Sequence, residues 1–308
     1  MPTLKEIKGR IGSVKSTLKI TSAMKLVSSA KLHKAQQATE AMRPYEEALL
    51  QILAATEIPG QAGNDAVVLG EQTVSVMPGP DRASRPRVIV AIASNSSLCG
   101  GFNANVIAKV REIRQPGDVI YSVGRKMADA MRREGYPTPE DLNSLIEHPT
   151  YSPAAALVEK FMEEQAQGRI GEVLLVYTHF VSTARQIPVV EQLLGEIPGQ
   201  AGNDAQSVLP GNDHTVMPDS DRASDGILIE PGRHELLESL LPKTIKLKLY
   251  SALLDSAAAE HAARTVAMQT ATDNAENLLA ELTLQYNKGR QQKITSEILD
   301  LAGGQAEQ

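Results

Sequence analysis

The chain has 308 residues, 42% of them hydrophobic and only 3% aromatic, which is enough apolar material for a core but favours helices packed through aliphatic side chains. A single cysteine, Cys99, excludes a disulfide within the chain and a cysteine-based metal site, and no run of about 18 apolar residues is present to span a membrane. The net charge of −6 hides an asymmetry, because eight basic residues and one glutamate give residues 1–34 a charge of +7. A basic arm on an acidic body indicates a binding partner.

The N-terminal segment carries a long helical pattern. Residues 3–43 contain no proline, and apolar side chains recur at spacings of three and four, which predicts a helix with a heptad seam. The seam is expected to run through Leu4, Ile7, Ile11, Val14 and Leu18 and then to shift to Met24, Val27 and Ala30. Pro44 is expected to kink or end the helix, because proline removes a backbone hydrogen bond.

The middle of the chain, residues 85–195, has a different pattern. Short β-branched runs alternate with helical patterns, and the first run is continuously apolar, as in a buried strand. We expect strands at 87–93, 118–123, 172–180 and 186–193, and helices at 103–113, 125–134 and 154–167. This alternation predicts a Rossmann-like α/β domain with a partly parallel sheet.

The C-terminal segment, residues 234–308, returns to a helical pattern. No proline occurs between Lys243 and Ala302, and Gly289 is the only glycine in that stretch. The expected apolar seam comprises Ile245, Leu249, Leu253, Ala257, Ala258, Ala259, Ala262, Ala263, Leu278, Leu282, Ile294, Ile298 and Leu301. Its many alanines allow another helix to approach closely.

Length decides how the two helical segments are arranged. A helix over residues 243–301 spans roughly 88 Å at about 1.5 Å per residue, and the N-terminal helix, within residues 1–56, spans roughly 60 Å. A compact chain of this length has a radius of gyration of only about 19 Å, so neither helix fits inside the domain. Since each helix has a seam that the other can bury, the sequence predicts an antiparallel two-helix coiled coil that projects from the α/β domain.

A segment rich in Gly, Pro, Asn and Asp occurs twice in the chain. Residues 57–66 recur unchanged at 196–205, and a second, closely related match follows each copy. This composition favours turns or disorder over a packed core, and surface loops tolerate insertion. We therefore interpret 57–84 and 196–224 as inserted loops, with residues 225–233 returning to the globular domain. A binding role for the repeat is the alternative.

The chemistry-bearing residues form no recognisable catalytic pattern. Cys99 has no histidine near it in the sequence to act as a base, so we interpret it as a small buried thiol at a tight turn that Gly100 and Gly101 permit. The turn lacks the spacing of a dinucleotide-binding loop, and no P-loop motif occurs. The six histidines lack metal-binding spacing. We expect no catalytic residue, no cofactor and no metal.

The basic N-terminal helix leaves three interpretations open: a solvated lysine face, a nucleic-acid-binding arm, or a surface for an acidic protein partner. Binding to nucleic acid usually uses stacking aromatic side chains, and residues 1–34 contain none. The polar residues between Arg264 and Lys293 similarly suit either solvent or a partner that changes its grip. Composition does not choose among these interpretations.

Three stretches resemble the signatures of a known family, in the right order. Residues 11–31 resemble the N-terminal signature of the ATP synthase gamma subunit, and residues 262–275 and 286–298 resemble its C-terminal signature. The globular-domain motif of that family is similar to a set formed by Leu98, Cys99, Gly100, Gly101 and Asn103. One departure is that Ser94–Ser97 stands where the family usually has an acidic-basic-glycine run.

This resemblance implies a setting for the protein. It implies a non-catalytic rotor shaft whose coiled coil lies inside a ring of three alpha and three beta subunits, while the globular end binds the epsilon subunit and the c-ring. In this family the catalytic nucleotide sites lie on beta. The chain would act at the cytoplasmic face of the bacterial inner membrane, as a peripheral protein with no membrane span and no nucleic-acid partner.

The resemblance also implies contact residues on the shaft. Met24 and Lys25 would meet the acidic lever loops of beta, and Arg264 and Gln269 would lie where a catch loop of beta is hydrogen-bonded. The bearing near the top of the shaft would involve Arg290, Gln291, Thr295 and Glu297. Opposite charges across such an interface favour engagement without a fixed, tightly packed contact.

Two other hypotheses compete with the rotor. The first is a stand-alone nucleotide-binding α/β enzyme with a helical dimerisation arm, which ATP binding or hydrolysis by the purified chain would support. The second is a basic arm that binds nucleic acid, which salt-dependent duplex binding by residues 1–56 would support. The rotor hypothesis requires the shaft to contact different beta conformers differently, since only differential contacts can drive a conformational change.

Overall fold

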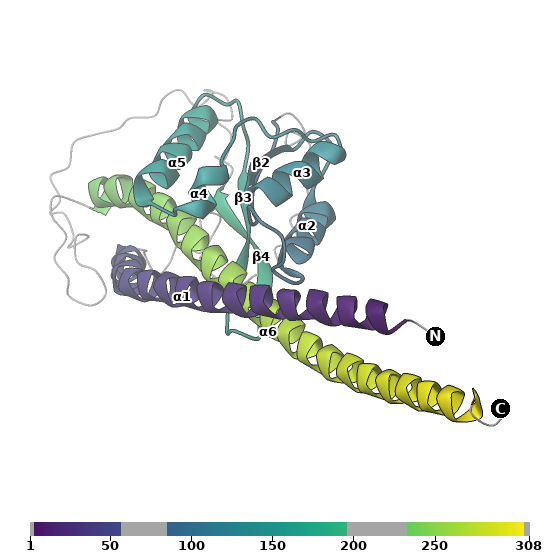
Figure 1. The fold of residues 1–308 in the computed structure, drawn as a ribbon. Helices are drawn as coiled ribbons and strands as arrows, with labels where there is room; N and C mark the ends of the chain where they lie inside the picture. Colours follow the sequence, from purple (N-terminus) through teal and green to yellow (C-terminus); the bar gives the residue numbers. More distant parts are fainter. Residues whose placement is uncertain (1–2, 57–84, 196–232, 305–308) are drawn as a thin grey trace, which may run out of the picture.

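The computed structural model describes residues 3–56, 85–195 and 233–304. Two long helices, α1 (Leu4–Thr56) and α6 (Arg233–Gly304), flank an α/β domain in the sequence and together form a rod along one side of it (Figure 1). The predicted inserted loops lie outside the described residues. So does most of the predicted return to the globular domain, and its last residue, Arg233, begins α6.

The domain is built on a sheet of four strands in the order β2-β1-β3-β4. The strands are β1 (Val88–Ile92), β2 (Val119–Val123), β3 (Val173–Phe180) and β4 (Gln186–Leu194). β1 pairs in parallel with β2 and β3, and β4 runs antiparallel to β3. All of β1 is buried because helices cover both faces of the sheet, which explains its continuous apolar run. The expected strands and the partly parallel sheet are confirmed.

Shorter helices enclose the sheet (Figure 1). They are α2 (Phe102–Ile113), α3 (Arg125–Arg133), α4 (Asn143–Glu147) and α5 (Tyr151–Ala166). On one face Ile89 of the sheet shares a core with Val106 of α2, and on the other Phe161 of α5 and Leu253 of α6 share a second core. The three helices expected in this region are confirmed. The sequence did not predict α4, because its 5 residues are too few to show a helical period.

Gly124 connects β2 to α3 with a φ of +101°. A Cβ at this position would lie 2.1 Å from the carbonyl oxygen of Ala93, a backbone atom that cannot move without disturbing β1. Gly124→Ala is therefore expected to lower the free energy of unfolding by about 2 kcal/mol or more, as measured by urea denaturation. Gly117→Ala is the control, since Gly117 also has a positive φ but has open space around it. Equal losses in the two variants would contradict the steric explanation.

α1 and α6 lie side by side and run in opposite directions (Figure 1). The hydroxyl of Thr272 donates to that of Thr21 at 3.0 Å. Further along, the hydroxyl of Ser251 donates to Glu46 at 3.2 Å, so residue numbers rise along one helix as they fall along the other. The 72 residues of α6 span about 108 Å at about 1.5 Å per residue, so the rod extends beyond the domain, as the length of the helical segments predicted.

The buried seam of α1 continues without the predicted shift. Beyond its first turns the buried positions include Thr21 and Ser28, whereas Val27 is 57% exposed and Ala30 is also exposed. The predicted shift to Val27 and Ala30 is therefore wrong, although Met24 is half-buried. Small hydroxyl side chains fit in the seam because the facing part of α6 is rich in alanine. The hydrogen bond that Thr21 accepts from α6 offsets the cost of burying its oxygen.

Pro44 does not end the first helix. α1 continues through this proline to Thr56, so of the two expected outcomes, a kink or an end, the end is excluded. The proline removes one backbone hydrogen bond, and packing against α6 stabilises the helix on either side of it.

The end of α6 extends past α1 as a single helix (Figure 1). Leu4, the first residue of α1, packs against Gly289. Ile294 and Ile298 lie beyond that point and are exposed, so their predicted place in the seam is wrong. Leu282 is buried as expected, whereas Leu278 is exposed. The tip of the rod therefore presents side chains that the described part of α1 does not cover.

Candidate functional site

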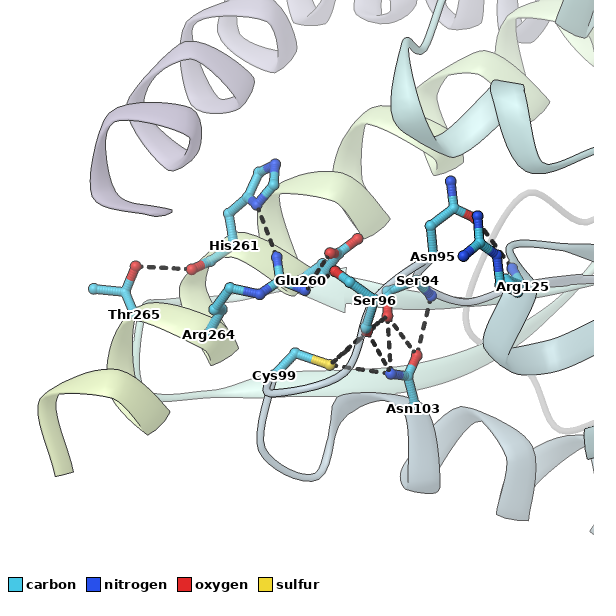
Figure 2. Close-up of polar contacts among 10 residues, drawn as sticks. All are labelled: Ser94, Asn95, Ser96, Cys99, Asn103, Arg125, Glu260, His261, Arg264 and Thr265. Atoms are coloured by element: carbon cyan, nitrogen blue, oxygen red, sulfur yellow. Dashed lines mark hydrogen bonds and ion pairs between the residues drawn. The ribbon is translucent and has the colours of Figure 1, made fainter. Parts of the chain in front are cut away.

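The loop that follows β1 is closed by hydrogen bonds around Asn103 (Figure 2). The backbone N–H of Ser94 donates to Asn103 Oδ1 at 3.0 Å, and Asn103 Nδ2 donates to the hydroxyl of Ser94 at 2.8 Å and lies 3.1 Å from Cys99 Sγ. Leu98 and Gly100 have φ of +68° and +57°, which turns the chain back towards α2. Cys99 is buried, which confirms its interpretation as a thiol at a tight turn. The structure thus brings these motif residues together in the turn that leads into α2.

α6 crosses this loop and binds it through Arg264 (Figure 2). Nη2 of Arg264 donates to the hydroxyl of Ser96 at 2.9 Å and lies 2.7 Å from Oε1 of Glu260, one turn earlier on α6. Arg264 and Glu260 are only 8% and 7% exposed. Burial raises the pKa of Glu260, and the charges of Arg264 and Lys31 oppose that shift. The sequence did not reveal this contact within the chain, because Ser96 and Arg264 are 168 residues apart.

His261, beside this ion pair, is held neutral (Figure 2). Burial lowers the pKa of His261 from 6.5 to about 4, and the charges of Arg264 and Lys31 act in the same direction. Between these two values the unfolded chain binds a proton that the folded chain does not. The contribution of neutral His261 to stability is therefore complete above about pH 6.5 and is lost as the pH falls towards about 4.

His261→Gln is expected to reduce the loss of stability in acid. The expected difference is about 1–2 kcal/mol after allowance for solvent screening, from urea denaturation of both proteins near pH 7 and near pH 4.5. Because Glu260 also has a shifted pKa, the decisive quantity is the difference between the two proteins and not the acid loss of either one. Equal acid losses in the two proteins would contradict the assignment to His261.

The place where α/β domains usually bind ligands is occupied by the chain itself. In the order β2-β1-β3 the carboxyl ends of β1 and β3 form the switch point of the sheet. Close to it, Cys99 and Phe102 pack with Ala259 and Ala263 of α6 and with Phe180 at the end of β3. This packing argues against the nucleotide-binding alternative. Within the described ranges, no group of three or more histidine, cysteine or acidic side chains is placed to hold a metal ion.

Comparison with known proteins identifies the family. The family model described as ATP synthase matches residues 3–306. The ATP synthase gamma chain of Phocaeicola vulgatus is 41% identical, over 99% of this chain and 99% of that protein. The gamma chain of Bacteroides fragilis strain YCH46 is 42% identical with the same coverage. The chain belongs to the ATP synthase gamma-chain family. It is thus a non-catalytic subunit of the ATP synthase and part of its central stalk, which confirms the resemblance drawn from the sequence.

Solved structures share the gamma-chain fold. A chain in the cryo-EM structure of the Euglena gracilis mitochondrial ATP synthase, described as OSCP/F1/c-ring in rotational state 3, matches with a TM-score of 0.65 and 18% identity, over 98% of this chain and 93% of that one. A chain in the structure of the rotor of the same enzyme matches with a TM-score of 0.62 and 18% identity, over 94% of this chain and 98% of that one. At these identities the likeness establishes the fold.

The contact residues expected for a gamma chain lie at two main levels of the rod, because the pairing of Thr21 with Thr272 in antiparallel helices places Met24 and Lys25 across from Gln269. Met24 and Lys25 are half-buried on α1, and Gln269 is half-buried on α6, where its Nε2 donates to Asp273 at 2.6 Å. The tip of α6 exposes Arg290, Gln291, Thr295 and Glu297. The structure therefore brings the contact residues of α1 to the level of Gln269, and it leaves the residues of the tip as a separate group. None of the helices in the described ranges is long and apolar enough to cross a membrane.

Sequence reasoning missed several exposed apolar side chains on the rod. Ile20 and Leu26 of α1 are 60% and 70% exposed, and Leu284 of α6 is 71% exposed. The sequence does show that these apolar residues lie outside the heptad seam. A helix face that is exposed to solvent usually lacks apolar residues.

Proposed function

We propose that this gamma chain is a rotor shaft that couples the turning of a c-ring to the conformational cycling of catalytic beta subunits. The observation that carries the proposal is the rod, whose longer helix continues alone past its partner and exposes apolar and polar side chains at several levels. Structures of the same fold belong to a rotor and to an enzyme in a named rotational state, which supports the same role here. In this function α1 and α6 act as a coiled coil, and residues 85–195 act as the globular end.

The first level of contact lies on α1, around Met24 and Lys25. Three strongly exposed apolar side chains, Ile20, Leu26 and Val27, are neighbours of these residues in a segment rich in lysine. An acidic loop of beta with an apolar edge suits this surface. Individual exposed ion pairs contribute at most about 1 kcal/mol, so such a contact can be released as the shaft turns.

The second contact lies on α6, at Gln269 and Arg264, close to the level of Met24 and Lys25, and meets a catch loop of beta. Gln269 needs only to release Asp273 to reach a partner. Arg264 makes its contact by exchanging the hydroxyl of Ser96 for a group on beta while Glu260 continues to hold the guanidinium. The cost of unpairing a buried arginine is thereby avoided.

The third contact is at the tip of α6, with Arg290, Gln291, Thr295 and Glu297. These side chains are exposed, and Lys293 and Glu297 form only a loose ion pair at 3.6 Å. A single helix with polar and apolar side chains around its circumference suits a bearing in which the surrounding ring contacts every face in turn.

The partners that this function requires are three alpha and three beta subunits around the rod, with the epsilon subunit and the c-ring at the globular end. The chain then acts at the cytoplasmic face of the bacterial inner membrane, as a peripheral subunit. The duplicated segments, 57–84 and 196–224, are proposed to be loops inserted at the borders of the globular domain. None of these assignments requires a cofactor or a nucleic-acid partner.

Affinity purification of the tagged chain from its own cells tests the assembly. We expect alpha and beta subunits to co-purify in threefold molar excess over the chain, and epsilon and c subunits to accompany them when membranes are solubilised with mild detergent. Recovery of the chain free of alpha and beta, or with equal amounts of each, would contradict the proposal.

A further inference from the structure

Asp255 of α6 is a largely buried carboxylate that none of the proposed contacts uses. It lies between Leu253 and Ala257 in the apolar part of α6, and its side chain is only 14% exposed. Its Oδ1 accepts a hydrogen bond from the backbone N–H of Phe180 at 3.0 Å, and its Oδ2 lies 2.6 Å from Nδ1 of His179. Both oxygens of one side chain on the rod therefore bind the last two residues of β3.

β3 connects the contact made by Asp255 to the rest of the sheet. It pairs with β1 over Val173–Val176 and with β4 along its whole length, so its last two residues are held in the sheet by β4. The hydrogen bond to Phe180 is made by the backbone, and a side-chain rotation in the sheet cannot release it. A charged acceptor strengthens this bond relative to a neutral one.

The other polar contacts between the rod and the domain also start on α6. Lys246 pairs with Glu159 of α5, and Lys248 pairs with Glu191 of β4, but both glutamates are substantially exposed. Arg264 is buried and donates to Ser96, which lies in the loop after β1 and not in a strand. The polar contacts of α1 at Thr21 and Glu46 go to α6. A turning force on the domain therefore reaches α6 first and α1 through α6.

We propose that Asp255 is a positioning residue that fixes the globular domain to the shaft against rotation about the axis of α6. This inference rests on the proposed rotor function. It identifies the contact of Asp255 with β3 as a point at which torque is transmitted from the globular domain to the rod. Apolar packing of α6 on the sheet also holds the two together, but it is non-directional. Two directed hydrogen bonds to consecutive residues of β3 resist that rotation.

The decisive variant is Asp255→Leu, which removes both hydrogen bonds and keeps an apolar side chain in an apolar seam. Asp255→Asn keeps an acceptor oxygen for the N–H of Phe180 and gives up the charge, and His179→Ala removes one of the two partners. Glu163→Leu is the matched control, because Glu163 is an exposed acid on α5. Each is combined with Ser152→Cys, which gives a unique attachment point for a probe on the domain because Cys99 is buried.

The measurement uses the complete complex with its alpha and beta ring fixed to a surface. We expect complexes with Asp255→Leu to assemble and hydrolyse ATP as the parent does, to show a wider angular spread of the stationary probe, and to pump fewer protons per ATP hydrolysed in vesicles. Asp255→Asn is expected to lie between the two, and Glu163→Leu to match the parent. A loss of stability alone would change the amount of complex and leave the angular spread of assembled complexes unaltered.

An unchanged angular spread and an unchanged pumping ratio in Asp255→Leu complexes would overturn the inference while leaving the rotor function intact. A parent complex whose probe does not rotate when it hydrolyses ATP would instead overturn the rotor function. If Asp255→Leu does not assemble, His179→Ala decides the question: a wider spread supports the positioning role, and a spread equal to that of the parent refutes it.

Discussion

Arg264→Ala is expected to lower the free energy of unfolding by about 3–5 kcal/mol, because it leaves the carboxylate of Glu260 buried without its cation. Both residues are less than one-tenth exposed, and Arg264 Nη2 lies 2.7 Å from Glu260 Oε1. The variant also removes the hydrogen bond to Ser96, which links α6 to the loop after β1. Urea denaturation of the purified chain near neutral pH measures the loss.

Two further results distinguish an unpaired buried charge from simple loss of packing. The loss in Arg264→Ala should shrink in acid, because protonation of Glu260 removes the uncompensated charge and burial already raises the pKa of Glu260. The double variant Glu260→Gln with Arg264→Met should recover most of the stability, since no buried charge remains. Lys293→Ala, which breaks an exposed pair on the same helix, is the control, with an expected change under about 1 kcal/mol. A loss in Arg264→Ala that is independent of pH and not recovered in the double variant would refute this explanation.

Leu253→Ala is expected to destabilise the chain by about 2–5 kcal/mol, as measured by urea denaturation, because the truncation leaves a cavity where α6 packs on the sheet. Leu253 is completely buried and belongs to the same core as Val90 of β1 and Phe161 of α5. The neighbouring elements are sheet and helix backbone on several sides, so the site has little freedom to collapse around a smaller side chain.

Leu284→Ala removes the same atoms from the same helix at a position that is 71% exposed. Its effect on the free energy of unfolding should be within about 0.5 kcal/mol. If the two leucine variants were equally stable, the packing of α6 against the sheet would not contribute as the structure indicates.

The architecture of the chain could be predicted because its strongest signals are local. The run from Val88 to Ile92 is β-branched and continuously apolar, and it forms a wholly buried strand. The two helical segments are too long for a compact domain, and that comparison of lengths required no partner to be known. Local pattern was also enough to interpret Cys99 as a buried thiol, since its paired glycines indicate a turn.

The details of the helix pair could not be predicted from apolar spacing alone. Thr21 and Ser28 lie in the seam because alanines opposite bring the helices close and a hydroxyl across the pair is hydrogen-bonded. A pattern that counts only apolar residues places Val27 in the seam instead of Ser28, but Val27 is exposed. Ile294 and Ile298 continue the apolar spacing of α6. They are not covered by α1, because the first residue of α1, Leu4, lies beside Gly289.

The polar contacts between rod and domain were hidden for a different reason. Arg264 contacts Ser96, and Asp255 contacts His179 and Phe180, across 168 and about 75 residues of sequence. No local spacing encodes such a pair. A buried-seam acid such as Asp255 or Glu260 does indicate that a partner exists, because burying an unpaired carboxylate is costly, but it does not say which residue the partner is.

Rotation of this chain inside its ring of alpha and beta subunits tests the central claim most directly. The ring is fixed to a surface, a probe is attached through Ser152→Cys on α5, and ATP is added. The account predicts that the probe turns continuously in one direction and pauses at three orientations, one for each beta subunit. A complex that hydrolyses ATP while its probe keeps a single orientation would contradict it.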